Sequence, residues 1–148
     1  MADPLLTGFY FSVAIGGQKN NSDAAFQEVL GLSKEFHVEE VACGGENRFK
    51  YRLPSGTTFQ NLVLKRGVTL SDSPLLKWCL DTLGNGLAMP IVTHDIIVNL
   101  LNDEGHSCKS WTFVKAYPVK WSASDLNSEK NAVFIETIEL AYLYFESA

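Results

Sequence analysis

The chain has 148 residues, of which 46% are hydrophobic and 20% are charged, a composition typical of one globular domain with a substantial core. Its net charge of −5 argues against a general binder of nucleic acid or membrane surfaces, because such proteins need a broad basic face. The three cysteines, Cys43, Cys79 and Cys108, are widely spaced and show neither a disulfide framework nor a zinc pattern. We therefore expect one domain over residues 1–148, with reduced thiols and no cofactor.

Short strands are expected in the first part of the chain. Residues 9–15 alternate apolar side chains in period two and stop at two glycines, which predicts a strand with one buried face. Residues 18–23 are polar and typical of a turn. Residues 26–32 and 34–41 are then predicted to form two further strands around Gly31.

Residues 44–67, the basic segment, combine an extended stretch with a strand. Between positions 48 and 53 three cations alternate with three large apolar residues, so an extended backbone would place them on opposite faces. The segment holds five cations and one carboxylate, a charge of +4, which leaves −9 on the rest of the chain. A long, positive loop at about residues 43–60 is typical of a functional segment that docks on an acidic surface. We expect that surface to be another copy of the chain, in a heterologous contact.

Only one helix is predicted, at about residues 73–83. Ser73 is expected as its N-cap and Pro74 as its first residue, and Gly84 and Gly86 flank its end. Its apolar residues are expected to form one buried stripe; they are Leu76, Cys79, Leu80 and Leu83, widened by Leu75 and Trp78. Such a helix is typical of an element that covers a sheet.

Three long strands are predicted at residues 91–101, 110–121 and 132–145, with a hairpin turn at residues 102–105 between the first two. Strands therefore dominate the chain. The predicted fold is mainly β, a small antiparallel β-barrel or orthogonal β-sandwich with one α-helix and a long extended loop.

Catalytic motifs are absent, and we expect no enzyme. His37, His94 and His106 are isolated, and His106 with Cys108 would give too few ligands for a metal site. The alternation of cations and aromatic rings in the basic segment is also typical of a platform for single-stranded nucleic acid, but the acidic remainder of the chain favours protein docking. Sequence-specific recognition of nucleic acid is not expected.

Three carboxylates are candidates for a lumen or an interface, namely Glu39, Glu136 and Glu139. Glu136 and Glu139 interrupt an otherwise apolar strand, and a lumen, interface or edge position would each explain them.

Six groups of residues carry a recognisable pattern. They are Val29-Leu30-Gly31-Leu32, Gly44-Gly45-Glu46-Asn47, Leu53-Pro54-Ser55-Gly56, Asn61-Leu62-Val63-Leu64-Lys65-Arg66-Gly67, Trp111-Thr112-Phe113 with Ala116-Tyr117-Pro118-Val119-Lys120-Trp121, and Ile135-Glu136-Thr137-Ile138-Glu139-Leu140-Ala141. In this order and spacing they resemble the inner tube proteins of contractile phage tails and extracellular contractile injection systems. The resemblance covers nearly the whole chain.

The resemblance implies a β-barrel shared with type VI secretion tube proteins, hexameric rings, and rings stacked into a hollow tube that a contracting sheath drives through a target envelope. It assigns contacts between subunits and between rings to a long loop, here Gly44, Gly45, Glu46, Asn47, Arg48, Phe49, Lys50, Tyr51, Arg52, Leu53 and Pro54. It assigns a signature strand to Asn61, Leu62, Leu64, Lys65, Arg66 and Gly67.

The implied partners are further copies of the chain, a sheath protein, baseplate or tube-initiating, spike and terminator proteins, and luminal cargo, either a protein effector or phage DNA. The implied assembly takes place in the bacterial cytoplasm without a Sec signal or a membrane span, and the particle acts outside the cell or anchored to it.

Two other functions fit the same residues. A tube-initiating baseplate protein would share the fold. A monomeric β-barrel that binds a ligand between Trp78, Trp111 and Trp121 would be a different class, although large aromatic residues more often pack in a core or an interface.

Overall fold

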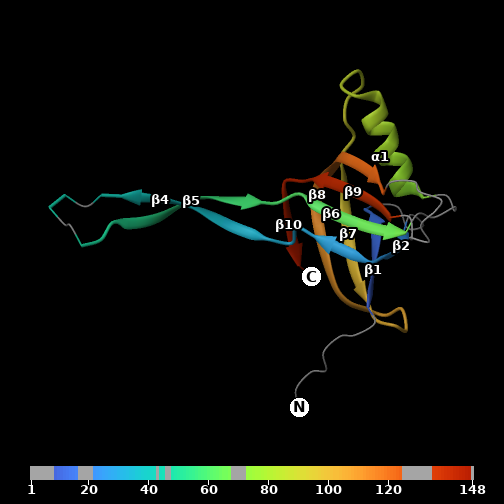
Figure 1. The fold of residues 1–148 in the computed structure, drawn as a ribbon, viewed down its shortest axis with the longest axis horizontal. Helices are drawn as coiled ribbons and strands as arrows, with labels where there is room; N and C mark the ends of the chain where they lie inside the picture. The colour runs from blue at the N-terminus through green and yellow to red at the C-terminus, as the bar shows by residue number, and fades with distance from the viewer. Residues whose placement is uncertain are drawn as a thin grey trace, which may run out of the picture. The chain divides into compact units, whose positions relative to one another are not determined.

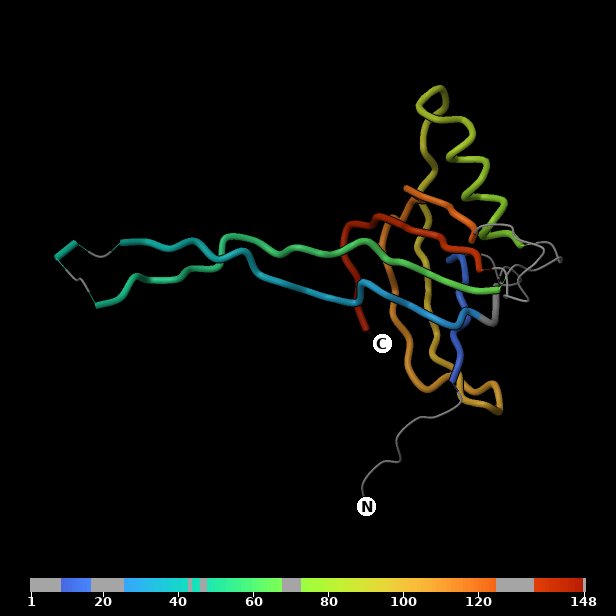
Figure 2. The backbone as a smooth tube through the Cα atoms, viewed as in Figure 1, coloured from blue at the N-terminus to red at the C-terminus, as the bar shows by residue number. Residues whose placement is uncertain are grey.

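Antiparallel strands make up most of the chain in the computed structural model, which describes residues 9–16, 22–42, 44–45, 48–67, 73–124 and 135–147. The contacts divide the chain into two compact units. We call the first, Met1–Leu30 with Asn61–Ala148, the body, and the second, Gly31–Gln60, the arm. Each unit is described separately (Figures 1 and 2).

The body is one curled sheet with a helix. Its strands lie in the order β2-β1-β7-β8-β9-β6-β3, and β10 also pairs with β8. Their bounds are β1 Tyr10–Ile15, β2 Ser22–Phe26, β3 Glu28–Leu30, β6 Leu62–Gly67, β7 His94–Leu101, β8 Ser107–Ala123, β9 Ile135–Ala141 and β10 Tyr144–Ser147. The predicted mainly β fold with one helix is confirmed.

The two ends of this sheet are joined by consecutive strands. β2 and β3 lie at opposite ends of the strand order, yet only Gln27 separates them, and the Gln27 N–H donates to the Lys65 carbonyl on β6 (2.9 Å). The sheet therefore curls so that β2 passes from β1 toward β6. β2 itself was not predicted, because we interpreted residues 18–23 as a turn.

A corner in β8 sets the break between β9 and β10. Lys115 has a positive φ of 51°, and its N–H donates to the Asp95 carboxylate (3.0 Å). At the same level the Leu143 N–H donates to the Val114 carbonyl (3.0 Å), between the last residue of β9 and the first of β10. The single strand predicted at residues 132–145 is therefore wrong within the described residues. Both β9 and β10 pair with β8: β10 pairs with residues 111–114, before the corner, and β9 pairs with residues 117–123, after it.

The β7–β8 hairpin matches the prediction from residues 102–105. The Asn102 side-chain oxygen accepts from the N–H groups of Glu104 (3.0 Å) and His106 (2.9 Å), which fixes the turn. Gly105 has a φ of 84°, a left-handed conformation that glycine adopts at low cost.

Alternate residues of the body strands form its core. Val13, Ile96, Val98, Phe113 and Leu140 are fully buried. Phe113 also contacts Tyr142 and Phe145, with ring centroids 4.9 and 5.2 Å apart, and burial raises the pKa of the Tyr142 hydroxyl.

The helix α1, Pro74–Asn85, begins and ends close to its predicted limits. The Ser73 side chain accepts from the Leu76 N–H, Pro74 is at the start, and Gly86 with a φ of 59° follows its end. The predicted apolar stripe is partly wrong. Leu75 and Cys79 are buried, but Leu80 is 43% exposed and Leu83 37%, so the buried face is rotated toward Leu75.

The arm is a two-stranded hairpin of β4, Lys34–Val41, and β5, Tyr51–Phe59. About half of the segment expected as a loop is thus paired strand. Pro54 can lie within β5 because a strand of a two-stranded sheet has one unpaired edge, and the register shifts between His37 and Val38, near Pro54 and Gly56.

Candidate assembly surfaces

One half of the body sheet presents two unpaired strand edges. Its order is β3-β6-β9-β8, where β8 contributes residues 117–123. Within the part of the chain that the structure describes, β3 pairs only with β6, and this part of β8 pairs only with β9. Unpaired backbone donors and acceptors on two edges of one sheet can each pair with a strand of another chain. The two edges are different, so the contact they favour is heterologous.

The side chains along these edges are complementary in charge and partly apolar. On β8, Val119 is 39% and Trp121 38% exposed, with the exposed Lys120 between them. On β3, Leu30 is 46% exposed and Glu28 is exposed, while Glu28 also lies 3.7 Å from Lys65. A lysine on one edge and a carboxylate on the other would favour β3 against β8 over either edge against itself.

The signature strand is β6, and it reaches two of the three candidate carboxylates. Asn61, just before β6, donates from its side chain to Glu139 (3.1 Å). Arg66, on the buried face of β6, lies 3.5 Å from the Glu136 carboxylate. Lys65 and Gly67 alternate with these buried positions along the same strand.

Glu136 lies inside the body. It is 1% exposed, its second oxygen accepts from the Trp121 indole N–H (2.9 Å), and β9 has neighbouring strands on both sides. This position is a core position, so the expectation of a lumen, interface or edge position for Glu136 is corrected. The reason is that Arg66 compensates the carboxylate inside the core.

The same pairing changes the charge of the basic segment. Arg66 and Lys65 belong to the body, where they meet Glu136 and Glu28, and not to the arm. In the sequence of the arm unit, four lysines and arginines stand against four glutamates. The loop predicted at about residues 43–60 keeps three cations against one glutamate, so the hypothesis of a positive docking segment stays a prediction for that loop alone.

The arm exposes large apolar side chains as predicted. Phe49, Tyr51 and Leu53 are each 50–52% exposed, and the rings of Phe49 and Tyr51 meet edge to face at 5.6 Å. The register places Arg52 opposite Glu40 and Leu53 opposite Glu39, so the cation and the apolar residues project from different faces. Of the predicted loop residues, Gly44, Gly45, Lys50 and Pro54 also lie in the described arm. Glu46 and Asn47 lie outside the described residues.

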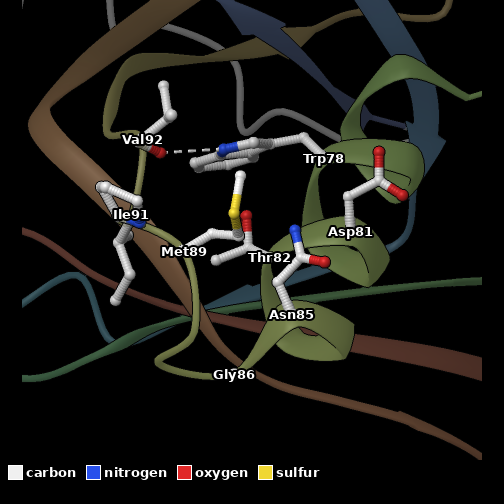
Figure 3. Close-up of a pocket in the computed structure, with 9 residues that line it drawn as sticks. Trp78, Asp81, Thr82, Asn85, Gly86, Met89, Ile91 and Val92 are labelled. Carbon is white, nitrogen blue, oxygen red and sulfur yellow. Dashed lines mark hydrogen bonds between the residues drawn. The ribbon is translucent and has the colours of Figure 1, made fainter.

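Of the three tryptophans, only Trp78 lines the two hollows beside α1 in the described residues. A hollow of about 210 Å³ lies beside α1 and is lined by Trp78, Met89 and Val92 among others, and the Trp78 indole donates to the Val92 carbonyl (3.0 Å; Figure 3). Neither Trp111 nor Trp121 lines it. This hollow is below the usual size of small-molecule sites, roughly 300–1,000 Å³. A second hollow, of about 390 Å³, is lined by Ile15, Trp78 and His94 among others, and again by neither Trp111 nor Trp121.

The described residues offer few groupings of metal-binding or thiol side chains. No group of three or more potential metal ligands occurs among them. Cys79 is buried and Cys108 is exposed, with its thiol 3.8 Å from the His106 carbonyl. No helix within the described ranges has the length and apolar character that a membrane crossing requires.

These features define a class of protein, a curled β-sheet that presents two unpaired edges in the described residues, in one chain with a separate two-stranded hairpin. A family model described as T4-like virus tail tube protein gp19 matches residues 7–146. The chain belongs to this tail tube family.

Several solved structures have a similar fold. One chain from the 6-fold symmetrised baseplate of the anti-feeding prophage is 29% identical, with a TM-score of 0.77, and the match covers 100% of this chain and 97% of that one. A chain from the sheath-tube complex of the extracellular contractile injection system PVC is 20% identical, with a TM-score of 0.77 and coverages of 97% and 90%. Hcp1 from Flavobacterium johnsoniae is 16% identical, with a TM-score of 0.53 and coverages of 94%. No curated protein sequence matches.

Proposed function

We propose that the protein is a structural, non-enzymatic subunit of the inner tube of a contractile injection system or phage tail. Copies join side by side into hexameric rings, and the rings stack into a hollow tube that a sheath drives through an envelope. The observation that carries this proposal is the pair of unlike, unpaired edges on one sheet, β3 and residues 117–123 of β8. Membership of the tail tube family supports it.

The ring forms when the β3 edge of one copy pairs with the β8 edge of the next. Each contact leaves one β3 edge and one β8 edge free at the two ends, so addition continues until the rotation closes. Closure removes every unpaired edge of this sheet, which also protects the subunit from unspecific aggregation. We treat residues 1–148 as one tube domain whose body forms the ring and whose arm reaches neighbouring copies.

The outward face of the same sheet is the proposed lumen wall. Most of its side chains are hydrophilic, and the register places them side by side: Glu28, Lys65, Thr137, Glu139, Lys120 and Ser122, with Leu30 and Val63 as apolar neighbours. Lysines and carboxylates balance on it, so cargo would meet a hydrated surface without a large field of one sign. Glu139 lies on this wall, whereas Glu39 lies on the arm and would meet a neighbouring subunit.

The arm supplies the contact between neighbouring rings. A two-stranded hairpin is marginally stable on its own, and this one exposes half of the surface of Phe49, Tyr51 and Leu53. Docking of the arm on other copies would bury these three apolar side chains. The sheath, baseplate, spike, terminator and cargo complete the particle, whose assembly in the bacterial cytoplasm precedes its action outside the cell.

A tube-initiating subunit is the second candidate. It is favoured by one observation, since the baseplate chain of the anti-feeding prophage is 29% identical to this chain and the PVC sheath-tube chain is 20% identical. Purified protein separates the two candidates. A main tube subunit would add rings to either end of preformed tubes of itself, whereas an initiator would stop at one or two rings.

Sedimentation of the purified chain with an arm variant tests the proposal. Arg48 and Lys50 are changed to Glu together, while Arg52 is retained because it lies opposite Glu40 within the hairpin. We expect the wild type to form particles of ring mass or larger. The variant should lose stacking, because like charges brought together at an interface cost several kcal/mol. A control with Lys77→Glu and Lys109→Glu has the same charge change on the body and should stack normally. Equal stacking of both variants would exclude the arm from the mechanism.

A further inference from the structure

Trp121 lies at the unpaired edge of β8, and a buried group holds it in place. Its indole N–H donates to the Glu136 carboxylate (2.9 Å), while 38% of the residue remains exposed. Because the polar N–H already has its partner inside, an exposed carbon surface is what the ring presents to solvent. Val119 and Lys120 precede it on the same edge.

Glu136 is in turn the centre of a chain of contacts that ends at the helix. Its other oxygen lies 3.5 Å from Arg66 Nε, and the same guanidinium donates to the Ser73 hydroxyl (2.8 Å). Ser73 also accepts from the Leu76 N–H and so caps α1. The contacts thus run from the exposed edge of β8 through β9 and β6 to the start of α1.

The centre of this chain of contacts is buried. The side chains of Arg66 and Glu136 are 4% and 2% exposed, and the guanidinium also lies over the Phe26 ring, 4.6 Å from its centroid. If either charged group moved away, the other would remain in the core without its partner, which is strongly unfavourable. The position of the Trp121 ring is therefore fixed before any contact forms.

We propose that Trp121 is the anchor of the contact that a second copy makes on the β8 edge, and that Glu136 and Arg66 are its positioning residues. The occupant is the β3 edge of the next copy, whose Val29 lies on the same sheet face as the ring and would cover it, and whose Glu28 lies on the same face as Lys120 and would meet it. Tryptophan is enriched among residues that dominate interfaces, and a preorganised ring loses little entropy on binding. This inference rests on the proposed function.

Concentration-dependent assembly of four proteins tests the anchor. The proteins are the wild type, Trp121→Ala, Trp121→Phe and the control Trp111→Ala, in which the tryptophan removed lies on β8 where strands flank both sides. We expect Trp121→Ala to raise the half-assembly concentration about thirtyfold or more, as for a dominant interface residue. Trp121→Phe keeps an aromatic surface and should recover part of this loss. For an equal loss of folding stability, Trp111→Ala should raise the half-assembly concentration less than Trp121→Ala does.

The positioning role has its own readout. Glu136→Gln keeps a side-chain oxygen for the Trp121 N–H but removes the charge that faces Arg66. In a protein whose only tryptophan is Trp121, through Trp78→Phe and Trp111→Phe, we expect acrylamide to quench the ring less after assembly. Glu136→Gln should lower the fluorescence anisotropy of Trp121 in the monomer and weaken assembly, whereas a purely structural role would change only the unfolding midpoint.

The outcomes separate this inference from the proposed function. If the wild type stays monomeric at every concentration, the proposed function fails and the anchor fails with it. If the wild type assembles and Trp121→Ala assembles at the same concentration, the anchor alone is refuted. Unchanged quenching of Trp121 on assembly would refute it too, and this measurement needs no variant at the edge.

Discussion

Replacing Arg66 with methionine should strongly lower the free energy of unfolding of the body, because the change leaves a buried carboxylate without its partner. Arg66 is 3% and Glu136 1% exposed, and their closest atoms are 3.5 Å apart. Methionine fills similar space but leaves Glu136 charged inside the core, and it removes the donor to the Ser73 hydroxyl.

The expected loss follows from these contacts. Removing one partner of a buried ion pair costs about 3–5 kcal/mol of unfolding free energy. Proteins of this size are stable by roughly 5–15 kcal/mol, so the variant would keep only part of its stability. At about 2–4 °C per kcal/mol the melting temperature should fall by roughly 6–20 °C.

Urea unfolding at one low protein concentration measures the effect, since assembly would otherwise raise the apparent stability. The control is the double variant Arg66→Met with Glu136→Gln, which removes both charges and keeps an acceptor for Trp121. We expect the double variant to be more stable than Arg66→Met alone, and a double-mutant cycle measures the coupling. An Arg66→Met protein that unfolds within about 1 kcal/mol of the wild type would refute the account of the buried pair.

Three further substitutions test single features of the body. Ser73→Ala removes the cap of α1 and should cost about 1 kcal/mol in urea unfolding, whereas the uncapping account fails if stability is unchanged. Gly105→Ala places a side chain at a φ of 84° and should cost roughly 1–2 kcal/mol, and equal stability would contradict the left-handed turn. Phe113→Ala empties a fully buried position against two rings and should cost about 3–5 kcal/mol, so a cost below 1 kcal/mol would exclude this core.

Local signals in the sequence predicted the elements that local chemistry determines. Ser73 and Pro74 fixed the start of α1, Asn102 and Gly105 identified the β7–β8 turn, and the alternation along residues 9–15 predicted β1. These signals depend on neighbours within a few residues, which is why they can be interpreted from one sequence.

Features determined by distant partners could not be predicted in the same way. A glutamate in an apolar strand has the same local pattern whether it faces a lumen or an arginine, and the partner of Glu136 is 70 positions away. The break after β9 depends on the corner at Lys115 in another strand. The balance of charges in the arm could not be predicted for the same reason, because it depends on the pairing of β4 with β5 in one unit.

The sequence also predicted one surface correctly and left the other unseen. Aromatic residues spaced by two predicted the exposed apolar face of the arm, where the rings of Phe49 and Tyr51 meet. The unpaired edges were not predicted as specific strands, because an edge is defined by a missing neighbour, which only the topology of the whole sheet reveals. The role proposed for Trp121 depends on that edge and on its hydrogen bond to Glu136, so it could not be predicted from the sequence.

Electron microscopy of the purified full-length protein over a range of concentrations tests the central claim most directly. The account predicts hollow rings with sixfold symmetry that stack into tubes as the concentration rises. A folded protein that remains monomeric at every concentration, or that forms closed dimers through like edges, would contradict it.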